Sequence, residues 1–378
     1  MPLVPAYIKQ LSSYKPGKPI EEVKRELGIK NIIKLASNEN PLGPSPKAKK
    51  AIQSNIEMIH RYPDVSGYDL RKKLAKKFKV KLNNVVIGAG SEGIMSTIMR
   101  TFLLNDDELL SSENSFIGYK VLAQASGRKT QWTPMKKNRY DLDAMAKKIN
   151  DYTKIIYIAN PDNPMGTYIT KDEFDEFYSY VPSRTLIILD EAYYEYANNI
   201  PDYPDSMYYR YNNVITLRSF SKAYGLGGLR LGYGFAHQDL ISNLMKVKVP
   251  FEPSILAQIA GCAAMEDIDF LKKTIQVNEV GLKFFENELD KMEIVYVPSA
   301  TNFITTIWKS EKEASRIVEK LMEAGIIVRH LKSFGWPNYI RISVGKENEN
   351  LRLISTLKTI LLIILTIKLM DSIIANFM

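Results

Sequence analysis

The sequence predicts an α/β fold, with a mostly parallel sheet flanked by helices in a large domain and a smaller α+β domain at the C-terminus. Short apolar runs rich in β-branched residues alternate with longer segments of helical periodicity, which is typical of parallel strands joined by helices. After about residue 270 this alternation gives way to helices and short strands. At 378 residues the chain is long enough for two or three domains.

The large domain contains five predicted strands. These are residues 84–87, 154–159, 186–189, 214–217 and 232–235. The first four each end just before a polar or glycine-rich turn. Ligands of open α/β sheets bind beyond the carboxyl ends of the strands, so these turns are where we expect the functional site.

The domain boundaries follow from these patterns. We expect an N-terminal arm and connection rich in Pro and Gly, a large domain and a small C-terminal domain, at residues 1–45, 46–270 and 271–378. The strands expected in the small domain are residues 294–297, 303–307, 326–329 and 339–344. The apolar run 360–367 is less than half of the about 20 residues that cross a membrane, so we expect a terminal helix packed on the small domain rather than a membrane contact.

Composition excludes several classes of protein. The single cysteine, Cys262, cannot form an intrachain disulfide, and neither it nor the three histidines show the spacing of a metal site, so we expect no metal. The start of the chain shows no secretory signal, and we expect a cytoplasmic protein. The net charge of +9 is densest at residues 71–81, where apolar residues at four-residue spacing predict an amphipathic helix with a solvated basic face rather than a nucleic-acid site.

The segment from Arg218 to Arg230 follows a predicted strand and places Lys222 next to Ser221, close to Ser219 and before a glycine-rich turn. A single lysine in a loop is usually a solvated charge. However, an aldehyde cofactor needs an amine of lowered pKa to form a Schiff base, and its phosphate needs hydroxyl, backbone and guanidinium donors nearby.

Three further turns follow predicted strands. Asp190 follows an apolar strand, where it could equally be a turn or helix-capping residue; a carboxylate there could also pair with a pyridine nitrogen. Asn163 lies in a Pro/Asn/Gly turn that is weak evidence alone. Gly90 begins a glycine turn and helix start, where free N–H groups can hold a phosphate.

In order and spacing these four turns resemble the fold type I, class I/II aminotransferases that depend on pyridoxal 5'-phosphate (PLP). The resemblance covers about residues 30 to 350 and narrows to the histidinol-phosphate aminotransferases. The motifs that narrow it are LASNENPLGP at 35–44, RYPD at 61–64, FSKAYGL at 220–226, ATNF at 300–303 and IRISVG at 340–345.

The resemblance implies a role for each matching residue in the transamination. Lys222 would carry PLP and move the substrate's α-proton, and Asp190 would pair with the pyridine nitrogen. Asn163 and Tyr193 would hydrogen-bond the phenolic oxygen of the ring, and Phe116 would stack on it. Without the resemblance, Phe116 could equally be a core aromatic residue.

The resemblance also implies how the anionic groups are held. The residues matching the phosphate site are Gly90, Ser91, Glu92, Ser219, Ser221 and Arg230, with Tyr62 reaching in from the other subunit of a homodimer. Those matching the substrate site are Tyr14, Arg329 and Arg341. The implied reaction belongs to histidine biosynthesis, an amino-acid biosynthesis pathway, and uses a small-molecule amino donor and a 2-oxo acid.

Three departures from the pattern and three alternatives remain. The run GSEG at 90–93 stands where a serine-aspartate-glutamate run is more frequent. Asp162 stands where asparagine is usual and could weaken anion binding, and Met165 stands where threonine is common. An aromatic amino-acid aminotransferase or a threonine-phosphate decarboxylase of the same fold would use Lys222, Asp190 and Arg230 alike. A PLP-binding regulator would carry an added DNA-binding domain, for which the arm is short.

Overall fold

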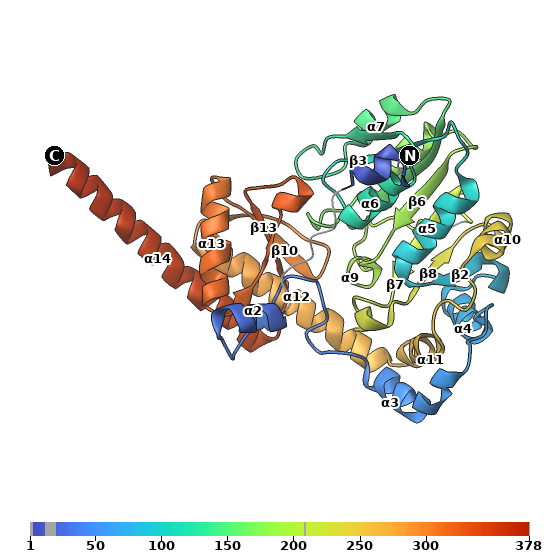
Figure 1. Cartoon of the computed structure of the whole chain (residues 1–378), viewed down its shortest axis with the longest axis horizontal. Helices are drawn as coiled ribbons and strands as arrows, with labels where there is room; N and C mark the ends of the chain where they lie inside the picture. Colours follow the sequence, from blue (N-terminus) through green and yellow to red (C-terminus); the bar gives the residue numbers. More distant parts are fainter. Residues whose placement is uncertain (1–2, 12–19, 208, 378) are drawn as a thin grey trace.

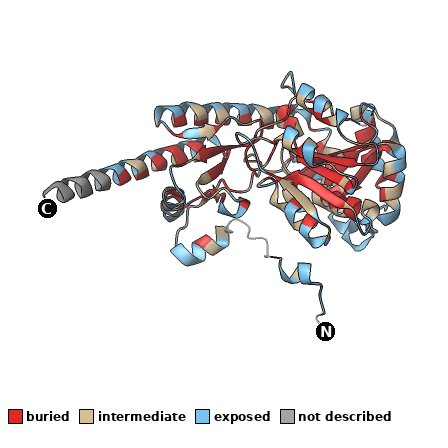
Figure 2. Cartoon of the chain, turned by 90° about the horizontal axis from the view of Figure 1, so that it is seen from above, coloured by how far each residue is buried: buried red, intermediate tan, exposed pale blue. Residues whose placement is uncertain are grey.

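The computed structural model describes residues 3–11, 20–207 and 209–377, with side chains up to residue 366. It confirms the predicted fold class: a large α/β unit and a smaller α+β unit lie side by side (Figure 1). Figure 2 shows the sheet of the large unit as buried residues enclosed by helices with exposed outer faces.

A seven-stranded mixed sheet forms the large unit, in the order β2-β8-β7-β6-β5-β3-β4. Its strands are β2 (Val85–Gly88), β3 (Glu108–Ser112), β4 (Thr130–Thr133), β5 (Thr153–Ala159), β6 (Leu186–Asp190), β7 (Val214–Ser219) and β8 (Gly232–Phe235). The five predicted strands are confirmed, with ends that differ by at most two residues. Strands β3 and β4 are additional.

The antiparallel strand β8 explains how turns from distant parts of the chain meet. It pairs antiparallel with both β2 and β7, so these two strands run in the same direction, and Gly88 and Ser219 both pair with Gly232. Strands β7, β6, β5, β3 and β4 are parallel. The carboxyl ends of all strands except β8 therefore lie along one edge of the sheet.

Helices cover both faces of the seven-stranded sheet. Successive residues of a strand point to opposite faces, and apolar residues on each face are buried under helices. One apolar core lies under α5 (Gly90–Phe102), α6 (Ile117–Ala125) and α10 (Gln238–Val247). A second lies under α7 (Leu142–Lys148) and α8 (Lys171–Ser179). A third joins β2 and β8 to α3 (Pro46–Ser54), α4 (Tyr68–Phe78) and α11 (Ile255–Ala264). The short helix α9 (Tyr194–Ala197) follows β6.

The basic stretch at 71–81 differs in one respect from the expectation. It lies mostly in the predicted amphipathic helix α4, whose Leu70 and Leu74 are buried. Arg71, however, is also buried: its Nε donates to Val85 O at 2.9 Å and its Nη2 to Leu82 O at 3.0 Å. This arginine ties α4 to the start of β2, so it does not belong to the solvated basic face.

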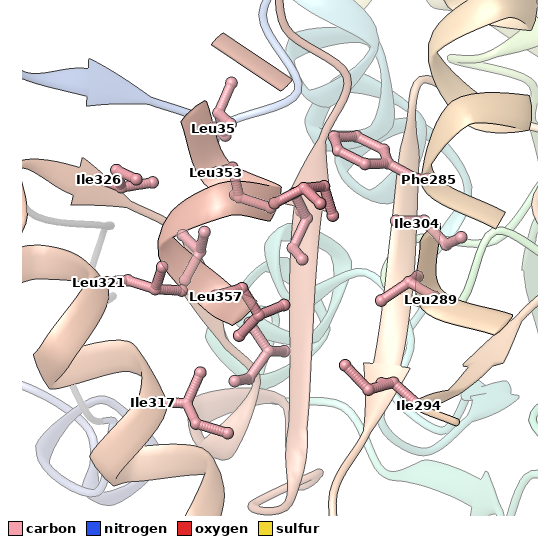
Figure 3. Packing of buried hydrophobic residues seen from close by; sticks show 14 of the residues in the cluster. Leu35, Phe285, Leu289, Ile294, Ile304, Ile317, Leu321, Ile326, Leu353 and Leu357 are labelled. Atoms are coloured by element: carbon pink, nitrogen blue, oxygen red, sulfur yellow. The ribbon is translucent and has the colours of Figure 1, made fainter. Parts of the chain in front are cut away.

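The smaller unit is built on an antiparallel sheet in the order β12-β13-β10-β9. Its strands are β9 (Val295–Val297), β10 (Phe303–Ile307), β12 (Arg329–His330) and β13 (Tyr339–Ser343). Its helices are α12 (Ile268–Lys291), α13 (Glu311–Glu323) and α14 (Glu347–Phe377). Their apolar residues meet in the core of Figure 3.

The N-terminal segment contributes to both units, because its first helix contacts α6 of the large unit and its strand pairs in the smaller one. It contains α1 (Ala6–Lys9), α2 (Ile20–Leu27) and β1 (Ile33–Lys34). Strand β1 pairs in parallel with β11 (Ile326–Ile327), and Leu35 enters the same core as α14. The connection from residue 33 onward thus crosses the smaller unit before it reaches the large one.

The expected terminal helix is α14, and its first part packs on the smaller unit. The buried residues on this side are Leu353, Ile354, Leu357, Ile360 and Ile364. None of the helices within the described residues combines the length and the apolar character that crossing a bilayer requires.

We predict that Leu357→Ala lowers the free energy of unfolding by about 2–5 kcal/mol, because a buried leucine loses its transfer energy and leaves a cavity. Leu357 is 1% exposed, and Figure 3 shows it close to Leu321 and Ile317. Denaturant titration measures the change. Leu362→Ala, at a site 65% exposed on the same helix, is the control and should change it by less than about 0.5 kcal/mol. Equal effects of the two substitutions would contradict this packing.

Candidate active site

A cavity of about 260 Å³ lies at the carboxyl edge of the seven-stranded sheet. The turns after β2, β3, β5, β6 and β7 line it together with residues 37–39. The predicted site residues that line it are Ser91, Glu92, Phe116, Asn163, Asp190, Tyr193, Ser219, Ser221, Lys222 and Arg230. Residues spread over 140 positions of the sequence therefore meet in one place, as the strand ends predicted.

Lys222 is held in a tight turn after β7. The Ser221 N–H donates to Ser219 Oγ at 3.0 Å, and the Gly225 N–H donates to Lys222 O at 3.0 Å. Gly225 has a φ of +68°, and a Cβ there would lie 2.1 Å from Gly43 O, so no other residue fits. Burial, reinforced by the nearby guanidinium of Arg341, lowers the pKa of Lys222 to about 8. About a tenth of its amine is therefore uncharged and nucleophilic at pH 7, far more than for an ordinary lysine.

Asp190 ends β6 with a carboxylate that is only half satisfied. Its Oδ2 accepts a hydrogen bond from Tyr157 Oη at 3.1 Å, whereas its buried Oδ1 has no hydrogen-bond partner among the described residues. Burial raises the pKa of Asp190 to about 7. A protonated ring nitrogen in the cavity would supply the missing donor and a compensating charge, so this residue fits the pyridine of PLP.

Tyr157 was missed by the sequence analysis. It lies inside the apolar strand β5, where a tyrosine is expected in the core, and its ring does stack on Tyr119 with centroids 3.9 Å apart. Ala159 pairs with Asp190 in the parallel register, so Tyr157, two residues earlier, faces the same side of the sheet. Sequence reasoning could have found Tyr157 only from its hydroxyl group and its position two residues before the partner of Asp190. That position is known only once β5 and β6 are aligned.

The start of α5 forms an anion site with Arg230. Gly90 has a φ of +76°, and a Cβ on it would lie 2.7 Å from Arg230 Nη2, so the guanidinium packs directly on the helix start. Ser91, Ser219 and Ser221 line the cavity beside it. Free helix N–H groups, hydroxyls and a guanidinium are the donors that a phosphate needs, and these residues fit that group of the cofactor.

The remaining lining residues come from the two units together. Tyr193 Oη accepts a hydrogen bond from Asn38 Nδ2 at 2.8 Å, and burial raises the pKa of Tyr193 to about 12. Asn163 Oδ1 accepts from Arg341, whose Nη2 donates to Ala36 O at 2.9 Å. Asn38, like Ser37 and Glu39, belongs to a motif quoted for the family but was not predicted as a site residue.

Arg329 and Arg341 lie side by side at the edge of the site. They are directly opposite each other on the antiparallel strands β12 and β13, so their side chains share one face of the small sheet. Both are buried, and both guanidinium groups lie within 6 Å of the Phe334 ring centre. Neither lines the cavity itself, and Arg341 reaches it through Asn163.

One further predicted residue, Tyr62, does not line the cavity. Tyr62 is 80% exposed and stacks on Phe251, with ring centroids 4.3 Å apart. Its predicted contact with the other subunit is not tested by a single chain. Tyr14 lies outside the described residues. Within the described part of the chain, no cluster of three or more His, Cys, Asp or Glu side chains could hold a metal ion.

Asp162, one of the departures from the family pattern, does not line the cavity. It is buried, and its Oδ1 accepts from Ser115 Oγ at 2.5 Å while its Oδ2 accepts from Met165 N–H at 3.1 Å. Burial raises the pKa of Asp162 to about 7. It connects the loop before Phe116 to the loop that carries Asn163, and it does not line the anion site.

Comparison with known proteins agrees with this geometry. The model of the family "Aminotransferase class I and II" matches residues 30–357. Histidinol-phosphate aminotransferase 2 of Carboxydothermus hydrogenoformans is 40% identical over 94% of this chain and 98% of its own length. The histidinol-phosphate aminotransferase of Anaeromyxobacter sp. is 42% identical over 96% of this chain and 100% of its own.

Solved structures extend the comparison to the fold. A histidinol-phosphate aminotransferase from Sinorhizobium meliloti, in complex with PLP, superposes with a TM-score of 0.87 at 28% identity, covering 95% of this chain and 98% of that one. An L-threonine-O-3-phosphate decarboxylase from Porphyromonas gingivalis, at 21% identity and a TM-score of 0.73 over 87% of this chain and 99% of its own, shares the fold. From the family match and the identity over nearly its whole length, the chain belongs to the class I and II aminotransferases and, within them, to the histidinol-phosphate aminotransferases.

Proposed function

We propose that the chain binds PLP on Lys222 and transfers the amino group of L-histidinol phosphate to 2-oxoglutarate, giving imidazole-acetol phosphate and L-glutamate in histidine biosynthesis. The observation that carries the proposal is a single cavity that joins a lysine of lowered pKa to a half-satisfied carboxylate and a helix-start anion site. The identity of about 40% to histidinol-phosphate aminotransferases supports the choice of substrate.

The residues divide the chemistry among them. When bound, the cofactor supplies an electron sink for the negative charge that develops on the substrate's α-carbon. Asp190 keeps a proton on the ring nitrogen, and Tyr193 and Asn163 donate hydrogen bonds to the phenolic oxygen. Lys222 Nζ would move the proton between the α-carbon of the substrate and the C4′ carbon of the cofactor. Phe116 covers one face of the ring.

The anionic groups are assigned to separate donors. Ser91, Ser219, Ser221, Arg230 and the helix start at Gly90 hold the cofactor phosphate. Arg341 and Arg329 bind the anionic group of the substrate, because a planar guanidinium fits phosphate or carboxylate oxygens in pairs. Glu92, next to Ser91 at the start of α5, also lines the cavity.

The proposal includes a homodimer acting in the cytoplasm. Tyr62 does not line the cavity of its own chain and is an exposed aromatic residue, which supports a role for it in the other subunit's phosphate site. Tyr14 is assigned to the substrate side on the family resemblance alone. A cytoplasmic location is supported by the single cysteine, since disulfides are rare in reducing compartments.

Half-reactions with single substrates test the function. Histidinol phosphate, tyrosine, phenylalanine and threonine phosphate are each mixed with the PLP-loaded protein, and the absorbance of the bound cofactor is followed. We expect histidinol phosphate to convert the cofactor fastest, and 2-oxoglutarate to restore the starting spectrum. Conversion by an aromatic amino acid but not by histidinol phosphate, or release of CO₂ from threonine phosphate, would contradict the proposed substrate. If none of the four compounds converted the cofactor, the result would favour a PLP-binding protein without transaminase activity.

A further inference from the structure

Asn38 connects the two units at the edge of the cavity. It is 1% exposed and lies in the left-handed region with a φ of 55°. Its N–H donates to Ser343 Oγ at 2.8 Å, and Asn302 Nδ2 donates to its carbonyl oxygen at 3.1 Å. Ser343, at the end of β13, and Asn302, just before β10, therefore fix the backbone of Asn38.

The orientation of the Asn38 amide follows from the hydrogen atoms available. Ser343 Oγ accepts the Asn38 N–H and has one hydrogen to donate, which goes to Asn38 Oδ1 at 2.9 Å. Reversing the amide would put a second donor on Ser343 and leave its hydrogen without a partner among the described residues. The amide nitrogen Nδ2 therefore faces Tyr193 Oη, 2.8 Å away.

This contact determines where the Tyr193 proton can go. Tyr193 Oη accepts a hydrogen from Asn38, so its own hydrogen must be donated elsewhere. Within the described residues the Tyr193 hydroxyl makes no other hydrogen bond, and both residues line the cavity. The hydroxyl hydrogen is therefore available to an acceptor in the cavity.

We infer that Asn38 is a positioning residue that directs the Tyr193 hydroxyl hydrogen into the cavity, with Ser343 holding the Asn38 amide in the orientation that does so. The inference rests on the proposed function, in which Tyr193 donates to the phenolic oxygen of PLP. The motif at residues 35–44 contains none of the predicted site residues, and the inference assigns a role to one of its members, Asn38.

Asn38→Asp is the most direct test. Aspartate has the same shape and tolerates a positive φ, but its carboxylate can only accept, so it draws the Tyr193 hydrogen away from the cavity. A hydrogen bond donated to the phenolic oxygen stabilises its deprotonated form. Its loss should raise, by about one pH unit or more, the pH at which the absorbance of the bound cofactor changes. The value of kcat should fall about tenfold or more.

A double-mutant cycle separates the role of Asn38 from the effect of an added charge. Tyr193→Phe should raise the absorbance pKa by itself, and adding Asn38→Asp should then raise it little further. A shift of the same size in the Tyr193→Phe background would show that the carboxylate acts directly, and would overturn the inference. An unshifted Asn38→Asp protein would overturn it as well.

Two further variants complete the design. Ser343→Ala frees the Asn38 amide to reverse, so we expect a smaller shift in the same direction, again lost with Tyr193→Phe; this variant serves if Asn38→Asp does not fold. Asn84→Asp is the matched control: Asn84 is also a buried asparagine whose Nδ2 donates a hydrogen bond, to Ala236 O at 2.9 Å, but it lies outside the cavity and should leave the spectrum unshifted. A wild-type protein that shows no cofactor spectrum would refute the proposed function instead.

Discussion

Lys222→Ala is expected to abolish transamination, lowering kcat by at least about 10³-fold, because no other described side chain in the cavity offers an amine to carry the cofactor and move the α-proton. PLP should still bind, since Ser219, Ser221, Arg230 and the start of α5 remain. Its spectrum should be that of the free aldehyde and should not change with pH as the wild-type spectrum does. Steady-state assays and absorbance spectra measure both effects.

The control for this experiment is Lys154→Ala. Lys154 lies near the amino end of β5, where its Nζ donates to Arg184 O, so it is a lysine of the same sheet at the opposite edge from the cavity. Its loss should leave kcat and the spectrum unchanged. A Lys222→Ala protein that still converts histidinol phosphate at more than a hundredth of the wild-type rate would refute the proposed mechanism. Addition of a small primary amine should restore part of the lost activity.

The strands of the large sheet show what periodicity can and cannot predict. Strands β5 and β6 contain nearly continuous apolar runs and β7 begins with Val214 and Ile215, as expected when both faces of a sheet are covered. Strand β4 has the sequence TQWT and lies at the sheet edge, and β3 ends in two serines, so neither shows such a run. The pairing of β3 with β5, and of β4 with β3, is a tertiary effect that overrides the local pattern.

The site shows a similar division. Residues next to a strand end, such as Asp190 and Lys222, could be predicted because the topology brings all such turns to one edge. Tyr157 and Asn38 could not, since one lies within an apolar strand and the other in a connecting segment. Their roles depend on register and on contacts between the two units, which the order of residues does not reveal.

The second large effect is expected for Asp190→Asn. The amide has the same shape but no charge, so it cannot keep the ring nitrogen protonated. Losing one partner of a buried ion pair costs about 3–5 kcal/mol, and kcat should fall by roughly 10²–10⁴-fold. The rate of a single half-reaction with histidinol phosphate measures this loss.

Without cofactor the same substitution should stabilise the protein at high pH. The folded-state pKa of Asp190 is raised from its ordinary 3.8 to about 7, so between these values the folded protein retains a proton that the unfolded chain has released. The free energy of unfolding therefore falls as pH rises from about 4 to about 7. Asp190→Asn lacks this decrease, so the apo variant should be more stable than the apo wild type at pH 8, with a smaller difference near pH 4.

Glu195→Gln distinguishes catalysis from burial. Glu195 is also a buried carboxyl group, its pKa is likewise raised to about 7 by burial, and its Oε2 has no hydrogen-bond partner among the described residues, yet it does not line the cavity. Its variant should show a similar gain in apo stability at pH 8 with little change in kcat. PLP should then stabilise the wild type and Glu195→Gln more than Asp190→Asn, because only Asp190 gains a charged partner when the site is filled. If PLP stabilised all three proteins equally, Asp190 would not be the partner of the ring nitrogen.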